Sequence, residues 1–334
     1  MNTIKCNLKS AQKTKKLLIE NNLLDRLHIP IKENSFIFFP INSFKKTKMI
    51  FKNGIFEKKE LDKVKKKDFK SLLPKNIDVP SSFDVIGDII IIEIKENMIK
   101  NEKKIAKALL KTYKNTKTIL KKAGEHSGEF RTQALKYLAG INKKETAYKE
   151  NNTKISLDVE KIYFSSRLST ERKRIFKKIK KGEKVLVMFA GCGPYPLTIS
   201  KNTNAKKIIG VEKNPIASEY FNKNIILNKI NNIEAINGDV KKIVPKLDEK
   251  FDRIIMPLPK DAAEFLYLAF HVSKKGTIIH LYGFEHEKEF NIALKKVDDV
   301  CRKHNIKYKL IELVKCGQYS PGKFRICVDF KILS

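Results

Sequence analysis

The sequence predicts an α/β protein in which a mainly parallel sheet follows smaller α+β modules. Strand and helix patterns alternate from about residue 181 onward, and such alternation builds a parallel sheet with helices on both faces. The first of these strands, in VLVMFAGCGPYPLTIS (185–200), breaks at two glycines and opens into a helix. The last two strands are joined through Ser320-Pro321-Gly322, too short a link for a helical crossover, so they should pair antiparallel.

The first 70 residues should form a small basic α+β domain. Short apolar runs such as FIFF (36–39) alternate with lysine clusters such as KVKKK (63–67), and a solvated linker should then reach Pro80. With 334 residues the chain is long enough for two or three domains. We therefore expect domains at 1–70, 80–180 and 181–334.

The middle segment should be a second α+β domain. FDVIGDIIIIEI (83–94) is rich in β-branched residues and predicts one strand, and a helix should follow over 98–113. ETAYKE (145–150) and KISLDVEKIYF (154–164) flank Asn151-Asn152 and predict a hairpin. Ser169-Thr170-Glu171 then opens a helix, ERKRIFKKIKKG, that Gly182 should close.

The elements of the last segment follow in a regular order. Its strands are expected at VLVMFA, KIIGVE, NIEAIN, DRIIMP and TIIHLY, and then near 308–315 and 325–333. Helices are expected directly after the glycines, in NPIASEYFNKNIILNK, in KDAAEFLYLAFHVS and before the last two strands. We find no internal repeat that would indicate a solenoid instead.

The charge balance indicates a polyanionic partner. Lys and Arg total 70 against 37 acidic residues, and the resulting net charge of +33 attracts nucleic acid at physiological salt. An AT-rich coding sequence would also raise the number of lysines, but it does not explain why acidic residues fail to keep pace. No apolar run approaches the ~20 residues that a membrane span needs. Because the N-terminus also lacks the apolar core of a secretion signal, we expect a cytoplasmic protein.

The cysteines and histidines do not suggest a metal site. The five cysteines (Cys6, Cys192, Cys301, Cys316 and Cys327) form no C-x-x-C pair, and the six histidines form no H-E-x-x-H or H-x-H motif. We expect neither a disulfide framework nor a bound metal.

The glycine loop and two acidic residues predict a nucleoside cofactor. Gly191 and Gly193 follow the first strand, but Pro196 stands where a dinucleotide fingerprint has its third glycine, which argues against NAD or FAD. Glu212 ends the next strand, 21 positions after Gly191, where an acid can bind two ribose hydroxyls. Asp239 ends the third strand, within reach of an adenine amino group. Together they favour S-adenosylmethionine, although a tight turn, a solvated strand end and a helix N-cap would explain them one by one.

Several motifs together resemble the archaeal and eukaryotic tRNA methyltransferases that make 1-methylguanosine at position 37, next to the anticodon. They are FAGCGPYP, Asn214-Pro215, FDRIIMPLPKDAAEFL, YFSSRLSTERKRI, GEFR (128–131) and QYSPGKFRICVDFKI. The resemblance implies a class I Rossmann-like methyltransferase domain preceded by smaller α+β domains. It also implies an N-terminal domain that inspects the tRNA body and a guanine flipped into a pocket. We expect a monomer that binds tRNA.

The resemblance further implies roles for individual residues. The family's catalytic Arg falls on Arg131, its catalytic Glu on Glu171 and its base-pocket aromatic on Tyr163. The positions expected around the cofactor are Arg167, Phe189, Gly191, Gly193, Glu212, Asn214, Asp239 and Pro257. Guanine N1 carries a proton at neutral pH, so Glu171 would remove it while Arg131 stabilises the charge that develops on O6. From the residues alone, Glu171 could instead serve the helix dipole, Arg131 a phosphate and Tyr163 the core.

Two positions depart from the family pattern. Val187 stands where the family commonly has an acid, and MPLP (256–259) replaces a common Asn-Leu-Pro, so Pro257 offers only a carbonyl. Two other functions stay open, namely carbon methylation of a tricyclic base in wyosine synthesis and RNA binding by an inactive relative. Aminocarboxypropyl transfer is disfavoured, because relatives with that activity look different at Arg167 and Glu171.

Overall fold

The computed structural model describes residues 1–63, 68–258 and 262–334. The chain divides into two compact units, Met1–Asp68 and Phe69–Ser334. Of the predicted lysine cluster, residues 64–67 lie outside the described residues. Within the described part of the chain, we find no helix with the length and apolar character that a bilayer crossing requires.

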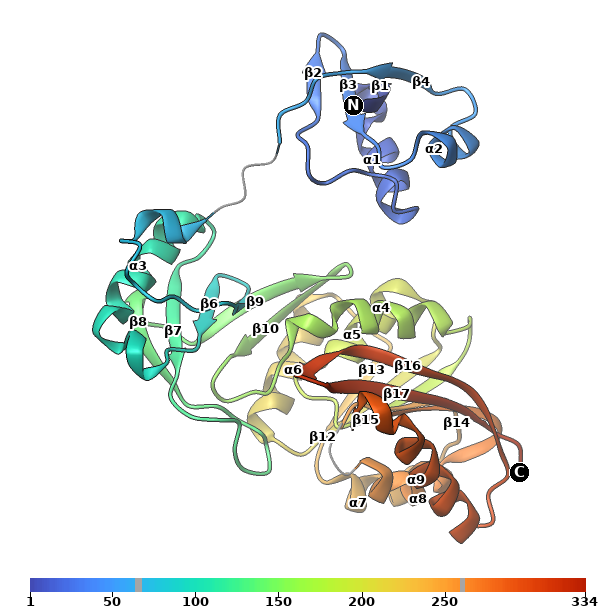
Figure 1. The fold of residues 1–334 in the computed structure, drawn as a ribbon. Helices are drawn as coiled ribbons and strands as arrows, with labels where there is room; N and C mark the ends of the chain where they lie inside the picture. The colour runs from blue at the N-terminus through green and yellow to red at the C-terminus, as the bar shows by residue number, and fades with distance from the viewer. Residues whose placement is uncertain (64–67, 259–261) are drawn as a thin grey trace. The chain divides into compact units, whose positions relative to one another are not determined.

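The first unit is a small antiparallel sheet with two helices (Figure 1). Its strands lie in the order β2-β3-β1-β4, and the FIFF run forms most of β3. The elements are β1 Asn2–Asn7, α1 Ala11–Glu20, β2 Ile31–Glu33, β3 Phe36–Pro40, α2 Phe44–Ile50 and β4 Ile55–Lys58. Apolar side chains from β1, β3 and α1, among them Ile4, Phe39 and Leu18, form its core.

The second unit begins with a four-stranded sheet of order β5-β6-β7-β8 packed against α3. These elements are β5 Phe83–Ile86, β6 Ile89–Ile92, α3 Glu102–Thr112, β7 Thr118–Lys122 and β8 Leu135–Gly140. The prediction of one strand over 83–94 was wrong, because Gly87 has a φ of +58° and turns β5 back onto β6. The predicted linker is also shorter, since Phe69 is already buried against β6 and α3.

The predicted hairpin is confirmed as β9, Glu145–Glu150, paired antiparallel with β10, Thr153–Asp158. Asn151 and Asn152 both have positive φ, as a tight two-residue hairpin turn requires. The second strand ends at Asp158 and not at 164, because the Asp158 carboxylate accepts hydrogen bonds from the backbone N–H groups of Glu160 and Lys161 and starts a turn. The helix α4, Ser169–Lys178, then stops before the predicted Gly182, since Ile179 is extended.

A seven-stranded sheet of order β13-β12-β11-β14-β15-β17-β16 forms the centre of the last segment (Figure 1). The strands are β11 Lys184–Met188, β12 Lys207–Glu212, β13 Ile233–Asn237, β14 Phe251–Met256, β15 Ser273–His286, β16 Tyr308–Ser320 and β17 Lys323–Ile332. The strands β11 to β15 are parallel to one another. The last two strands, β16 and β17, pair antiparallel as predicted, and β17 also pairs antiparallel with β15. Strand β16 lies at one edge, and its register with β17 shifts at three points.

Helices cover both faces of this sheet. Alternate residues of β11 point to opposite sides, so that Val185 and Val187 face one apolar core and Leu186 and Met188 face the other. The helices are α5 Pro194–Asn202, α6 Pro215–Leu227, α7 Val240–Ile243, α8 Leu266–His271 and α9 Phe290–Lys303. The first core includes α4, α5 and α6, and the second includes α7, α8 and α9. Because the strand order reverses between β11 and β14, a crevice is expected beyond the carboxyl ends of these two strands.

Candidate active site

The glycine loop joins β11 to α5, and its two glycines have different surroundings. Both are left-handed, with φ of +56° at Gly191 and +88° at Gly193. A Cβ on Gly193 would lie 2.2 Å from Cδ2 of the buried Phe221, whereas a Cβ on Gly191 would meet no atom within 4 Å. Gly193 therefore allows α6 to pack against the loop, and Gly191 leaves space that a ligand can use.

This space is part of a cavity of about 510 Å³ at the carboxyl ends of the strands. Its volume lies within the range of small-molecule sites, roughly 300–1,000 Å³. The predicted site residues that line it are Arg131, Tyr163, Phe189, Gly191, Glu212, Asn214, Asp239 and Pro257. Gly193, Arg167 and Glu171 do not line it.

Backbone hydrogen bonds hold Glu212 in the lining of this cavity. Its two carboxylate oxygens accept hydrogen bonds of 2.7 Å from the backbone N–H groups of Gly191 and Asn214. Burial raises the pKa of the Glu212 carboxyl, and these backbone donors oppose that effect. Each oxygen keeps a further lone pair, so the carboxylate can accept hydrogen bonds from two neighbouring hydroxyls of a ligand.

Two other predicted residues cap helices beside the cavity. Asn214 accepts a hydrogen bond from the N–H of Ile216 and so caps α6, and Asp239 accepts one from the N–H of Lys241 and so caps α7. Asp239 also pairs at 2.9 Å with Lys213, whose hydrogen bond is the main cause that keeps the pKa of Asp239 below its usual value. The alternative reading of Asp239 as an N-cap thus holds, and the same residue faces the cavity.

Arg131 lies where this cavity meets a second one. It has a φ of +52°, and its backbone carbonyl is 2.8 Å from Nδ1 of His126. Its guanidinium lies over the rings of Tyr163, at 5.2 Å, and Phe284, at 5.9 Å, and its Nη1 is buried without a hydrogen-bond partner. This donor is therefore free to meet an acceptor from outside the chain.

The second cavity measures about 760 Å³ and shares Arg131 and Tyr163 with the first. It is bounded by β5 and β6, the loop before β8, the segment 162–168 and the β16–β17 hairpin. Arg167 lines this second cavity and not the first, and it forms an ion pair of 2.7 Å with Asp84. Arg131 and Tyr163 thus border two adjoining spaces, which suits a reaction between two bound molecules.

Comparisons with known proteins identify the family. Residues 146–311 match the TRM5/TYW2 methyltransferase domain, residues 67–144 the TYW2 N-terminal domain and residues 3–44 the tRNA methyltransferase 5 N-terminal domain. The tRNA (guanine(37)-N(1))-methyltransferase Trm5b of Pyrococcus abyssi is 35% identical over 336 residues, which cover 98% of each chain. The chain belongs to the TRM5/TYW2 methyltransferase family.

Two further TRM5/TYW2 proteins bear on substrate and activity. The tRNA (guanine(37)-N(1))/4-demethylwyosine(37)-methyltransferase Taw22 of Nanoarchaeum equitans is 34% identical over 304 residues, 75% of this chain and all of that one. The solved complex of aTrm5 with tRNALeu aligns with a TM-score of 0.70 and 34% identity, covering 99% of this chain and 100% of the other. These matches confirm the family and the Rossmann-like fold that the motifs indicated.

Glu171, which the resemblance led us to expect as the catalytic base, is buried and lines neither of the two cavities. Its carboxylate accepts hydrogen bonds of 2.7 and 2.8 Å from Arg174 and one of 2.6 Å from the hydroxyl of Tyr282. Arg174 in turn binds Asp329 at 2.6 Å. Among the described residues no hydrogen bond or shared cavity joins Glu171 to Arg131, and both carboxylate oxygens of Glu171 already accept hydrogen bonds within the chain.

Sequence reasoning missed three polar side chains that build the site. Arg172 lines the first cavity and forms a fully buried ion pair with Glu150 of β9. Asn224, buried in the middle of α6, donates to the carbonyls of Ser156 and Cys192 and so ties the hairpin to the glycine loop. Lys213, next to Glu212 in the chain, pairs with both Glu129 and Asp239, a position that the strand-end pattern could have suggested.

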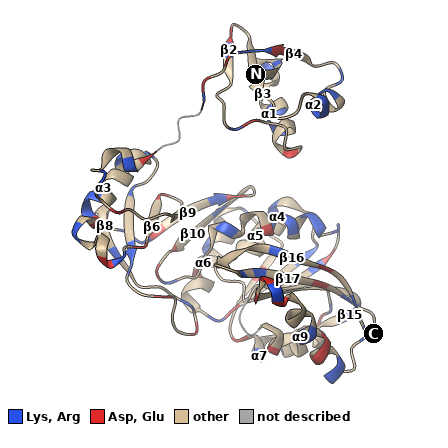
Figure 2. Ribbon diagram, in the orientation of Figure 1, with Lys and Arg blue, Asp and Glu red and all other residues tan. Residues whose placement is uncertain are grey.

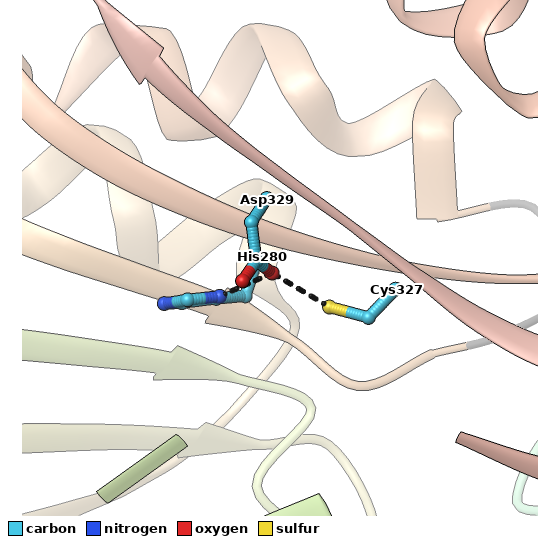
Figure 3. A group of neighbouring side chains, drawn as sticks. All are labelled: His280, Cys327 and Asp329. Carbon is cyan, nitrogen blue, oxygen red and sulfur yellow. Dashed lines mark hydrogen bonds and ion pairs between the residues drawn. The ribbon is translucent and has the colours of Figure 1, made fainter. Parts of the chain in front are cut away.

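A buried cluster of His280, Cys327 and Asp329 has the spacing of metal ligands (Figure 3). His280 Nδ1 lies 2.6 Å, and Cys327 Sγ 3.1 Å, from the same Asp329 oxygen. His280 Nε2 lies 2.8 Å from Arg253, which can only donate, so His280 is neutral and its proton is on Nδ1. With guanidinium groups on both sides, these three residues form a hydrogen-bonded network that disfavours a cation.

Proposed function

We propose that this protein transfers a methyl group from S-adenosylmethionine to N1 of guanosine 37 in tRNA. The observation that carries the proposal is the unpaired Arg131 guanidinium at the border of the two cavities. Arg131 and Gly191 line the same cavity, so an acceptor bound by Arg131 and a ligand beside Gly191 would share that space. Full-length similarity to a protein named for this reaction supports the same assignment.

The first cavity suits S-adenosylmethionine. Glu212 would accept hydrogen bonds from the ribose hydroxyls, Asp239 from the adenine amino group, and Gly191 would allow the close approach of the ligand to the backbone. Phe189 and Pro257 would provide walls, with Asn214 and Gly193 supporting the loop. When bound, this cofactor supplies an electrophilic methyl group on a positively charged sulfur.

Arg131 and Glu171 are the proposed catalytic residues. Loss of the N1 proton places negative charge on guanine O6, and the permanent charge and forked donors of Arg131 would stabilise it. Glu171 would accept the N1 proton. Because its carboxylate is bound by Arg174 and Tyr282, this role requires the side chain to exchange Arg174 for the substrate. Asp329 would then remain as the partner of Arg174.

The substrate is proposed to be tRNA, bound by a monomer in the cytoplasm without a metal ion. Lys and Arg gather along α3 and α4 (Figure 2), and the basic run KKIKK (177–181) begins in the last turn of α4 and continues past it. Tyr163 would shape the pocket for the flipped base, and Arg167 would lie near that base and not at the cofactor. We also propose that 1–70, 80–180 and 181–334 act as tRNA-binding, middle and catalytic domains.

The test is nucleoside analysis by mass spectrometry of an unmodified tRNA transcript with G37, incubated with the protein and S-adenosylmethionine. We expect 1-methylguanosine, and we expect Arg131→Ala and Glu171→Ala each to lower its rate by about 10²–10⁴-fold. Glu219→Ala, which alters an exposed pair on α6, is the control. Tight binding of both substrates without methylation would identify an inactive relative.

A second candidate is carbon methylation of a tricyclic wyosine-type base at the same position. The similarity to Taw22, whose name covers both reactions, favours it, as does Pro257 at a strand end that lacks the family's common amide. The same assay with tRNA carrying 4-demethylwyosine distinguishes the two. Methylation of that tRNA alone would exclude guanosine as the substrate.

A further inference from the structure

Arg325 of β17 is a buried cation without an anionic partner. It is 9% exposed, and among the described residues no carboxylate lies within ion-pair distance of it. Its Nη2 donates to the Tyr163 hydroxyl at 2.8 Å, and its Nε is buried without a hydrogen-bond partner. Removing a charge from water without a partner costs several kcal/mol, so a ligand that neutralises it is expected.

The strands beside Arg325 hold it toward the second cavity. It is paired in register with Phe284 of β15 and Gly317 of β16, and its guanidinium lies 5.1 Å from the Phe284 ring. Phe284 packs at 4.3 Å against Tyr319, which fixes the ring in place. Since Gly317 has no side chain, the strand opposite Arg325 leaves the cavity open, and Arg325 lines it.

The other charges of the second cavity are largely neutralised. Asp84 pairs with Arg167 and Glu93 with Lys122, and Glu125 is exposed on the loop before β8. This leaves two guanidinium groups near the same Phe284 ring, that of the half-buried Arg131 at 5.9 Å from the ring centroid and that of the buried Arg325 at 5.1 Å. Two like charges in one poorly solvated place repel each other, so the pair favours a ligand with more than one acceptor.

We propose that Arg325 binds a backbone phosphate of the RNA next to the target nucleotide, while Arg131 faces the base. This inference rests on the proposed function, because it takes the second cavity as the site of that nucleotide. A phosphate diester offers two charged oxygens to the forked donors of a guanidinium. The same contact would fix Tyr163, whose hydroxyl accepts from Arg325 and keeps its own proton free to donate to the base.

The test combines a protein substitution with an RNA substitution. Binding of a G37 anticodon-loop RNA is measured for the wild-type protein and Arg325→Gln, with ordinary linkages and with a neutral methylphosphonate 5′ or 3′ of the target. We expect either change alone to weaken binding about 10- to 100-fold, as loss of a charged hydrogen bond does. At one of the two linkages, both changes together should weaken it no further. Arg325→Lys should retain part of the affinity.

Lys323→Gln is the matched control, because it removes an exposed charge from the same strand. Arg325→Gln should lower the slope of log K against log salt by about 0.7, the value for one single-strand phosphate. For Lys323→Gln, the effect on RNA binding should be the same whether or not a linkage is replaced by methylphosphonate. Thermal unfolding and S-adenosylmethionine binding verify that each variant is folded.

Three outcomes would overturn the proposal. The first is wild-type RNA binding that does not change when either linkage is made a methylphosphonate. The second is full additivity of Arg325→Gln and the methylphosphonate at both linkages. The third is an Arg325→Gln variant that binds S-adenosylmethionine more weakly and RNA normally, which would assign Arg325 to the carboxylate of the cofactor. RNA binding of the wild-type protein and of Arg325→Gln can be measured even if the protein does not methylate tRNA. A failure of the proposed function can therefore be distinguished from a failure of this inference.

Discussion

Alanine at each glycine of the loop separates a packing role from a ligand role. In Gly193→Ala the new Cβ would lie 2.2 Å from the Phe221 ring at a φ of +88°. Overpacking costs about 1–3 kcal/mol and a left-handed alanine about 1–2 kcal/mol, so about 2–5 kcal/mol is expected. In Gly191→Ala the Cβ meets no atom within 4 Å, and only the left-handed cost of about 1–2 kcal/mol remains.

Thermal unfolding followed by circular dichroism measures the first effect. In a domain of this size about 1 kcal/mol lowers Tm by roughly 2 °C. Gly193→Ala should therefore lower Tm by about 4–10 °C, and Gly191→Ala by about 2–4 °C. Titration calorimetry with S-adenosylmethionine should show the opposite order, because only the Gly191 methyl group enters the cavity.

The reasoning is refuted if Gly191→Ala loses more Tm than Gly193→Ala, or if Gly193→Ala loses more affinity for S-adenosylmethionine than Gly191→Ala. If Gly191→Ala unfolds at the lower temperature and binds the cofactor normally, the loop does not approach the ligand at Gly191. Phe221→Leu in the Gly193→Ala background is the control for the clash. It should recover part of the lost Tm, since the smaller side chain relieves the contact with the new Cβ.

Three further predictions address charged groups. Glu150→Gln should destabilise the protein by about 3–5 kcal/mol in urea unfolding, because it leaves Arg172 buried and unpaired. Adding Arg172→Met should recover stability. A loss below about 1 kcal/mol in Glu150→Gln would contradict this role of the ion pair. Burial lowers the pKa of His280. Burial alone would raise the pKa of Asp329, but hydrogen bonds from His280 and Arg174 outweigh it and lower this pKa. As pH falls, the unfolded state therefore binds protons first, so Tm should decrease from about pH 6.5 downward and again below about pH 4. His280→Gln should flatten the upper part of that decrease, and an unchanged profile would refute the assignment. Glu212→Gln should weaken S-adenosylmethionine binding about 10- to 100-fold by calorimetry, because an amide NH2 cannot accept the hydrogen bonds that one carboxylate oxygen accepts. Equal affinity would exclude a ribose contact.

The alternating pattern of the catalytic segment could be predicted because parallel strands are buried on both faces. Runs such as KIIGVE and DRIIMP are apolar on both faces of a strand, so they are stable only inside a sheet that is covered on both sides. They form β12 and β14 at the expected positions. Glu212 and Asp239 could be predicted with them, since the carboxyl ends of parallel strands meet at one edge of a sheet. The error at 83–94 had the opposite cause, because the only local sign of a turn inside that run was Gly87.

The parts that could not be predicted depend on contacts between distant segments. Asn224 occurs in an unremarkable stretch of α6, and its partners Ser156 and Cys192 are 68 and 32 positions away. Nothing in the sequence separates Arg325 from the other basic residues, because its burial, its hydrogen bond to Tyr163 and its contact with Phe284 arise only from packing. No periodicity distinguishes such residues, because their roles follow from tertiary packing.

The irregular pairing of β16 has a consequence for solubility in a crowded cell. An unbroken edge strand presents a continuous row of free N–H and C=O groups, to which a strand of another molecule can add. The register shifts at Leu310/Glu312, Lys315/Gly317 and Gln318/Ser320 interrupt that row and twist the edge. The hairpin that carries Arg325 can thus remain open to RNA on one side while its edge gives other chains no template for aggregation.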